Sequence, residues 1–344
     1  MEFRNYTPFV PMVFENIDVN DNPFKIVILK GTFKIVKDAP LKPIPDQHPL
    51  VLTDEFYGEM NESSIRFESD LVPYKPNSDI IVNAIAHSPE KRPVPQWMVS
   101  VQVGELKKEL LVMGKRFWKR MGMMWKLTKA EPCLQVPIKY ENAYGGQWQD
   151  NDQLDVFEEN PVGCGYVNKK FLKNIEQIPA PGIMNKEDPV TVFNQHYKPQ
   201  GFSTISKSWT QRRQYTGTYD DKWIKERHPY LPKDFDFAYY NCSHPDMIYN
   251  GYLTGNETVE LKNLHPEHKK LQFGLPDYKV FLLLRYLNGS MKVCKVSLDT
   301  LHIELPEEQA YLVWRGQFDI GEPLRVIEAR MIIPESTENR KKNG

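Results

Sequence analysis

Proline restricts what this chain can fold into more than any other residue type. The sequence has 27 prolines among 344 residues, nearly 8%, against about 5% in an average protein. A proline inside a helix removes a backbone donor and clashes with the preceding turn. Long helices are therefore not expected to dominate the fold, and extended segments joined by turns are expected instead.

Extended segments are indicated in the first third of the chain. Residues 24–36 are rich in β-branched and aromatic side chains, and their polar positions fit a period of two. Residues 79–86 and 97–103 have the same character. Gly104-Glu105 follows the last of these runs, and a Gly-X pair at this place favours a type II′ hairpin.

The last third of the chain repeats this pattern. Asn288-Gly289 lies between the apolar runs 280–287 and 291–303, which is typical of a two-residue hairpin turn. Two further alternating runs cover residues 310–318 and 324–333. We therefore predict a mainly β fold, with antiparallel, sandwich-like sheets at both ends of the chain and a few short helices.

The middle of the chain differs from both ends. It is rich in Pro, Gly, Asn, Asp and aromatic residues and shows little periodicity, so long irregular loops are expected. So long an irregular stretch inside a compact domain is normally functional. The predicted organisation is an N-terminal β-rich module (1–125), an irregular loop-rich region (126–270), a C-terminal antiparallel β module that packs with the first (271–334) and a disordered tail (335–344).

Charge and composition exclude several classes of protein. Lys and Arg total 44 and Asp and Glu total 45, so the net charge is −1, and bulk positive charge cannot recruit nucleic acid. The four cysteines form no C-x-x-C pair, and the nucleotide, hydrolase and zinc-protease motifs are missing from the sequence. The N-terminus lacks an apolar signal segment, and the run 280–284 is too short to span a bilayer. We expect a cytoplasmic protein with no cofactor, no metal, no nucleic-acid partner and no membrane insertion.

A basic run at residues 106–127 allows two interpretations. It contains seven Lys or Arg residues against one acidic residue, and its apolar side chains also recur at helical spacing. An amphipathic basic helix for a membrane surface or a partner is one possibility. Gly114 and Gly122 would interrupt such a helix, and the preceding hairpin turn predicts a return strand, so we favour strands.

The segment 201–246 holds the densest mixture of aromatic and charged residues. Two of its carboxylates could act as the acid and base of a glycosidase-like hydrolase. The same carboxylates could instead pair with arginines and hold an aromatic-rich loop, which we favour, and the segment could also be a protein-binding surface. The carboxylates are Asp220, Asp221, Glu226, Asp234 and Asp236, and the arginines are Arg212, Arg213 and Arg227.

An ordered series of short motifs resembles a bacterial family catalogued as domain of unknown function 2169. The resemblance covers about residues 1–330. The chain departs from the family pattern at Asn241-Cys-Ser-His-Pro-Asp246, where small apolar residues are expected before the proline. The matching motifs are Ser63-Ser-Ile-Arg66, Ser69-Asp-Leu-Val-Pro-Tyr-Lys-Pro76, Val101-Gln-Val-Gly104, Tyr140-Glu-Asn-Ala-Tyr-Gly-Gly146, Asn160-Pro-Val-Gly163, Gly201-Phe202, Gly217-Thr-Tyr-Asp220 with Trp223, and Leu231-Pro-Lys-Asp-Phe-Asp236.

This resemblance implies a non-enzymatic adaptor or chaperone for type VI secretion. Such a protein holds a toxic effector in the cytoplasm and delivers it to the VgrG spike or the PAAR tip. It needs aromatic loops on a rigid scaffold and no cofactor. The chain carries no fused pentapeptide-repeat or PAAR segment, so we expect it to act in trans on a cognate effector and a VgrG or PAAR protein. The residues expected to bind the partner or organise the loops are Trp209, Arg212, Arg213, Tyr219, Asp220, Trp223, Arg227, Tyr144, Gly145 and Gly146.

Overall fold

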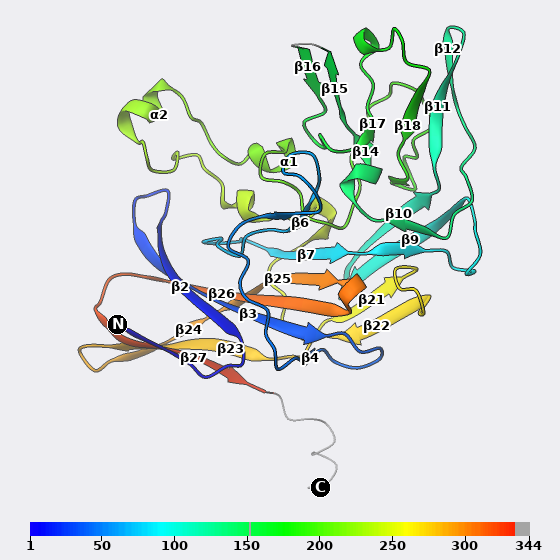
Figure 1. The fold of residues 1–344 in the computed structure, drawn as a ribbon. Helices are drawn as coiled ribbons and strands as arrows, with labels where there is room; N and C mark the ends of the chain where they lie inside the picture. The colour runs from blue at the N-terminus through cyan, green and yellow to red at the C-terminus, as the bar shows by residue number, and fades with distance from the viewer. Residues whose placement is uncertain (151–152, 334–344) are drawn as a thin grey trace.

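Strands make up most of the regular structure, which confirms the expected mainly β fold. The computed structural model describes residues 1–150 and 153–333. Figure 1 shows three larger sheets in the lower part of the molecule, with smaller sheets and short helices projecting above them. The tail expected at residues 335–344 lies outside the described residues.

The largest sheet combines strands from both ends of the chain. The apolar run in β3 is buried along most of its length, because side chains on both of its faces are covered. Val27 and Leu29 face the main core, and Ile26 and Ile28 face a smaller cluster on the other side. In order, the strands are β2 (Val10–Ile17), β3 (Pro23–Lys34), β26 (Gln309–Asp319), β25 (Ser297–Glu304), β7 (Ser78–Asn83) and β20 (Ile248–Tyr249), with β4 (Lys42–Pro43) beside β3.

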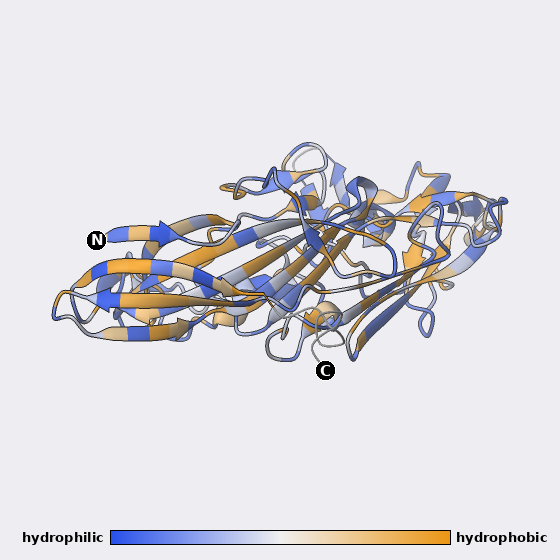
Figure 2. Cartoon of the chain, turned by 90° about the horizontal axis from the view of Figure 1, so that it is seen from below, coloured by the Kyte–Doolittle hydropathy of each residue, from blue (hydrophilic) through white to orange (hydrophobic). Residues whose placement is uncertain are grey.

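Two further sheets complete the main core, and Figure 2 shows hydrophobic residues running along their strands. A five-stranded sheet has the order β19 (Ile183–Met184), β10 (Leu106–Met113), β9 (Gln96–Val103), β21 (Thr258–Lys262) and β22 (Lys270–Gly274). A four-stranded sheet has the order β1 (Glu2–Asn5), β27 (Leu324–Ile332), β23 (Lys279–Tyr286) and β24 (Met291–Lys295).

Both expected hairpins are confirmed, but the turn of the second is longer than the two residues expected, since Arg285 pairs with Met291, and Gly289 but not Asn288 has a positive φ. Strands β9 and β10 are joined at Gly104, with a φ of 54°, and β23 and β24 at Gly289, with a φ of 86°. Glycine adopts such left-handed backbone angles without the penalty that a Cβ brings. The single strand expected over residues 291–303 is wrong, because the chain leaves the four-stranded sheet after β24, packs Val296 against the main core and enters the largest sheet as β25.

The region 126–270 holds long loops and short helices, but part of it is regular sheet. Strand β21 lies between β9 and β22 and alternates buried and exposed residues, with Val259 and Leu261 in the core. The structure therefore contains strands where the sequence indicated only loops. The helices are α1 (Thr210–Arg213), α2 (Asp221–Glu226), η1 (Tyr140–Asn142), η2 (Lys169–Phe171), η3 (Phe237–Tyr240), η4 (Pro245–Met247) and η5 (Leu305–Glu307).

The basic run 106–127 forms strands, as we favoured, and the helix alternative is wrong. Its second half is a hairpin in a three-stranded sheet, ordered β12 (Met124–Leu127), β11 (Arg116–Met121) and β18 (Gln177–Ala180). The inner face of this sheet covers a second core around Trp118, Tyr144 and Tyr197. No helix in the described part of the chain combines the length and the apolar content needed to cross a membrane. The two-stranded sheets are β5 (Glu55–Phe56) with β6 (Ile65–Phe67), β8 (Ile85–His87) with β13 (Gln135–Pro137), β14 (Tyr144–Gly145) with β17 (Cys164–Gly165), and β15 (Gln147–Asp150) with β16 (Gln153–Val156).

Candidate partner-binding site

Four of the predicted site residues lie on one projecting part of the chain. Residues 214–236, which we call the α2 lobe, leave helix α1, form helix α2 and return toward η3 (Figure 1). They contain Tyr219, Asp220, Trp223 and Arg227. The remaining predicted residues lie elsewhere and are described after the lobe.

Carboxylate side chains stabilise the α2 lobe by accepting hydrogen bonds from backbone amides. Asp220 is the N-cap of α2 and accepts a bond of 2.8 Å from the Trp223 amide. Asp234 accepts from both the amide (3.0 Å) and the hydroxyl (2.7 Å) of Thr218, and these bonds lower the pKa of the Asp234 carboxyl. Asp236 caps η3 in the same way. Three of the five carboxylates considered for catalysis therefore satisfy backbone donors.

Arg227 attaches the α2 lobe to the scaffold. Its guanidinium donates two hydrogen bonds, of 3.1 and 2.9 Å, to the Asp21 carboxylate in the β2–β3 turn. Its Nε donates to the Leu231 carbonyl at 2.8 Å, within the lobe. This bidentate geometry fixes orientation as well as distance, so the lobe has a defined position on the β scaffold.

An apolar and aromatic patch remains exposed on the anchored lobe. Tyr219, Ile224 and Tyr230 are 51%, 59% and 47% exposed. The rings of Tyr219 and Trp223 meet edge to face at 4.6 Å, and Trp223 Nε1 donates to the Tyr230 carbonyl at 2.9 Å. Tyrosine and tryptophan dominate the energetics of protein interfaces. We call Tyr219, Trp223, Ile224 and Tyr230 the aromatic patch.

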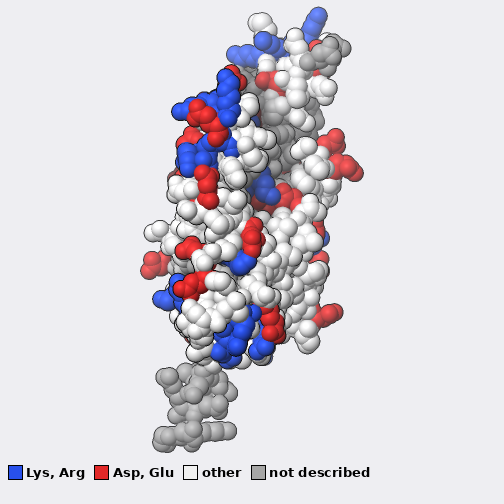
Figure 3. Space-filling model, turned by 90° about the vertical axis from the view of Figure 1, so that its left-hand side faces the viewer, with Lys and Arg blue, Asp and Glu red and all other residues white. Residues whose placement is uncertain are grey.

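The surroundings of the aromatic patch carry charges of both signs. Figure 3 shows Lys and Arg interspersed with Asp and Glu on the side of the molecule that carries α2. An open pocket of about 500 Å³ lies on the lobe, and its lining includes Trp223, Arg227, Lys233 and Asp234. Mixed charge gives little long-range steering, so a partner of this surface would be recognised by shape and aromatic contact.

Trp209 and Arg212 are buried below the lobe and are not surface residues. The Arg212 side chain donates two hydrogen bonds to Glu68, of 3.0 and 2.9 Å, and two more to the carbonyls of Ile205 and Tyr239. Burial raises the pKa of Glu68, but the charge and hydrogen bonds of Arg212, together with the charges of Lys207 and Lys75, outweigh burial and leave that pKa below its ordinary value. Trp209 packs edge to face on a buried tyrosine. Both residues organise the loops that carry the lobe.

The remaining predicted residues lie outside the lobe. Tyr144 is buried in the second core, and Gly145 follows it where a Cβ would lie 2.1 Å from the Asn160 carbonyl oxygen. Gly146 adopts a φ of 124°, which a residue with a side chain rarely takes. Arg213 is exposed and pairs with a surface glutamate. Of the predicted residues, Tyr219 and Trp223 thus belong to the aromatic patch, and Asp220 and Arg227 hold the lobe. The others are buried positions that hold the loops, except Arg213, which is exposed.

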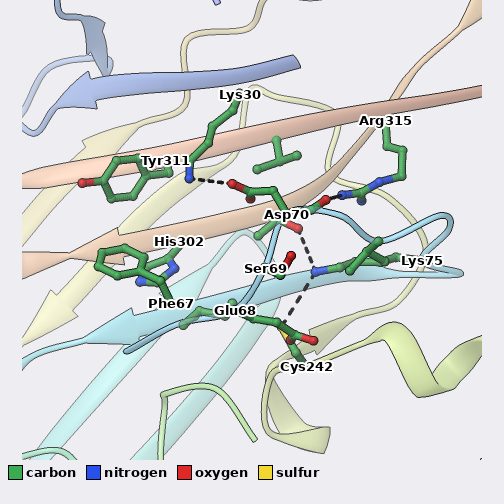
Figure 4. Close-up of a pocket in the computed structure, with 14 residues that line it drawn as sticks. Lys30, Phe67, Glu68, Ser69, Asp70, Lys75, Cys242, His302, Tyr311 and Arg315 are labelled. Atoms are coloured by element: carbon green, nitrogen blue, oxygen red, sulfur yellow. Dashed lines mark hydrogen bonds and ion pairs between the residues drawn. The ribbon is translucent and has the colours of Figure 1, made fainter. Parts of the chain in front are cut away.

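A buried ionic cluster was missed by the sequence reasoning. Figure 4 shows two of its members, Lys75 and Cys242, which line a small pocket beside the cluster. Lys75 donates to Asp79 at 2.7 Å, and the amides of Cys242 and Ser243 both donate to the same carboxylate at 3.1 Å. The pocket beside the cluster has a free volume of about 30 Å³, roughly that of one water molecule, and is too small for a ligand. The cluster therefore serves to hold the loops on the sheet. The sequence feature that could have indicated this cluster is Asp79, an acidic residue at the start of an otherwise apolar strand.

Comparison with known proteins places the chain in a family. The family model described as "Uncharacterized protein conserved in bacteria (DUF2169)" matches residues 21–315. The chain belongs to this bacterial family, as its ordered motifs indicated. No curated protein and no solved structure matched the chain. Among the described residues, no group of three or more His, Cys, Asp or Glu side chains is arranged to hold a metal ion.

Proposed function

We propose that this protein is a non-enzymatic adaptor that binds a type VI secretion effector in the cytoplasm and helps to load it onto a VgrG or PAAR spike protein. The observation that carries the binding role is the aromatic patch, which is exposed while the lobe around it is fixed by Asp220, Asp234 and Arg227. A preorganised aromatic surface binds a partner at low entropic cost. The secretion role is supported by the resemblance of the ordered motifs.

The test of the adaptor role is capture and secretion of the neighbouring toxin. The tagged protein should co-purify with the product of an adjacent toxin gene, and deleting the adaptor should stop secretion of that toxin. The double variant Tyr219→Ala/Tyr230→Ala should reduce capture by about tenfold or more, because truncated aromatic anchors each cost more than about 1 kcal/mol. Tyr6→Ala is the matched control, since Tyr6 is 58% exposed but follows strand β1 of the four-stranded sheet, outside the α2 lobe.

Two results would contradict the adaptor proposal. Unchanged toxin stability and secretion in the deletion strain would remove the delivery role. Full capture by the Tyr219→Ala/Tyr230→Ala variant would instead leave delivery intact and remove the aromatic patch as the contact surface.

The hydrolase alternative has less support. Asp220, Glu226 and Asp234 line the same open pocket, but Asp220 and Asp234 already accept hydrogen bonds from the lobe itself. The lowered pKa of Asp234 is opposite to the raised pKa that a glycosidase general acid needs. A glycosidase activity that the wild type has and Glu226→Gln lacks, with no toxin captured by the wild type, would favour the hydrolase over the adaptor.

A further inference from the structure

We propose that the outer face of the β11–β12 hairpin, residues 119–126, is a second docking surface, and that it takes an extended acidic protein segment whose side chains on one face alternate between acidic and apolar. This surface is independent of the aromatic patch. Figure 1 shows β11 and β12 on the opposite side of the molecule from α2. An adaptor with both surfaces could hold two partners at once.

The first observation is an unneutralised pair of like charges. The strand register places Lys119 directly opposite Lys126, so both side chains are on the same face of the sheet. Both are exposed, and neither is within ion-pair distance of a carboxylate of the described residues. Like charges directly opposite each other destabilise an antiparallel pair. Acidic side chains of a partner would remove this repulsion.

The second observation is an exposed methionine pair beside the lysines. The next pair on this face is Met121 with Met124, which are 59% and 73% exposed, and Met123 at the turn is 100% exposed. Methionine is flexible and polarisable, and it is over-represented on surfaces that adapt to partners. The face therefore offers a cationic row followed by an apolar row. A segment whose side chains at every second position alternate between acidic and apolar matches both rows, because successive residues of a strand point to opposite faces.

The third observation is the free edge of the three-stranded sheet. Among the strands of residues 1–150 and 153–333, the order β12-β11-β18 leaves β12 without a neighbour on one side. An edge strand presents unpaired backbone groups to which an extended segment can add as a further strand. The edge lysine Lys126 repels a second copy of the same strand. An acidic segment is therefore the occupant that fits both the edge and its charge.

A lipid surface fits this face less well than a protein segment. Lipid offers no backbone groups to pair with β12. The tryptophans of the hairpin, which would anchor it at a membrane interface, are turned to the opposite face, where Trp118 is buried and Trp125 stacks on Phe193 with 4.8 Å between ring centres. The protein segment is the occupant that the hairpin favours.

The test uses the full-length protein and a synthetic probe. The probe is a fluorescein-labelled peptide of about nine residues, the length of an ordinary strand, in which every second residue is Glu and Val in turn and the residues between are Ser. Binding is measured by fluorescence anisotropy. Affinity should fall when salt is raised from about 50 mM to about 200 mM. The double variants Lys119→Ala/Lys126→Ala and Met121→Ser/Met124→Ser should each weaken binding by about fivefold or more.

The chain offers a matched control on another exposed edge. Strand β24 also ends its sheet and carries an exposed methionine followed by a lysine, so Met291→Ser/Lys292→Ala should leave binding unchanged. A peptide with the same side chains but N-methylated at alternate residues should not bind, because it lacks the donors that strand addition needs. Lys119→Ala/Lys126→Ala should melt at or above the wild-type temperature, which shows that the variant folds.

Each of four outcomes would overturn the proposal. They are unchanged affinity in the lysine double variant, loss of binding in the β24 control, equal binding of the N-methylated peptide, and failure of the peptide to bind while phosphatidylserine-containing vesicles do. None of these outcomes affects the toxin-capture test, since that test depends on residues of the α2 lobe.

Discussion

Replacing Arg212 with methionine tests whether a buried ion pair holds the loops below the α2 lobe. Arg212 is 2% exposed and its partner Glu68 is also buried. Methionine keeps most of the apolar volume but removes four hydrogen bonds, two of which go to the Glu68 carboxylate. The variant therefore leaves a buried carboxylate without its main partner.

The expected loss follows from the contacts that remain. Breaking a buried pair by removing one member costs about 3–5 kcal/mol. Lys207 Nζ lies 3.4 Å from Glu68 Oε1 and would still compensate part of the Glu68 charge. A stability loss at the lower end of this range, about 3 kcal/mol, is therefore expected. Arg213→Met is the matched control, because the neighbouring arginine is half exposed in a surface pair that contributes at most about 1 kcal/mol.

The pH dependence separates this reasoning from a general packing defect. In the wild type the pKa of Glu68 is lowered, so its contribution is present above the ordinary carboxyl pKa and is lost as pH falls through the folded value. Without Arg212, burial should raise the pKa of Glu68. Protonation of Glu68 at low pH should then remove the unpaired buried charge and reduce the variant's loss of stability. The difference in free energy of unfolding should therefore shrink below about pH 5.

Urea unfolding followed by far-ultraviolet circular dichroism measures these differences. The double variant Glu68→Gln/Arg212→Met should recover more than half of the loss, since no buried charge is left unpaired. A stability loss that Arg213→Met equals, or that stays constant from about pH 7 to about pH 4, would refute the explanation.

Two other predictions concern a backbone contact and a buried histidine. Gly145→Ala should lower the free energy of unfolding by roughly 2 kcal/mol or more, because the new Cβ would clash with the Asn160 carbonyl. Gly122→Ala is the control and should cost about 1 kcal/mol, because φ is 65° there but no atom lies within 4 Å of the new Cβ. Burial and the Lys108 ammonium lower the pKa of His244 to about 3. Below about pH 6.5 the unfolded chain therefore binds a proton at His244 that the folded chain does not bind, and the free energy of unfolding should fall as pH drops. His244→Asn should reduce the slope of melting temperature against pH between about 7 and 5, and an unchanged slope would contradict this assignment.

Much of the local structure was predictable because it depends on neighbouring residues. The two hairpins are set by a period-two pattern and a turn with glycine at a left-handed position, at Gly104 and Gly289. Proline and the aromatic loops correctly indicated a chain with few and short helices. Asp220 was expected to organise its loop, and an Asp just before a helix is a local N-cap signal.

The site was less predictable because its parts come from distant segments. Trp209 and Arg212 belong to the same sequence block as Tyr219 and Tyr230, but the first two are buried and the last two are exposed. Composition identifies the block but not which side chains face solvent. The burial of Arg212, for example, depends on its pairing with Glu68, which lies 144 residues earlier in the chain.

The class of fold, the hairpins and the family follow from the amino-acid sequence, since each is carried by short, ordered patterns. The strand order, in which β25 pairs in parallel with β7 and β26 pairs with β3 from the other end of the chain, is known from the tertiary structure alone. The tertiary structure also decided which charges are buried together, as in the pair of Lys75 and Asp79 held by the loop at Cys242. These contacts join segments far apart in sequence, and a residue's local pattern carries no record of the partner that compensates its buried charge or pairs with its backbone.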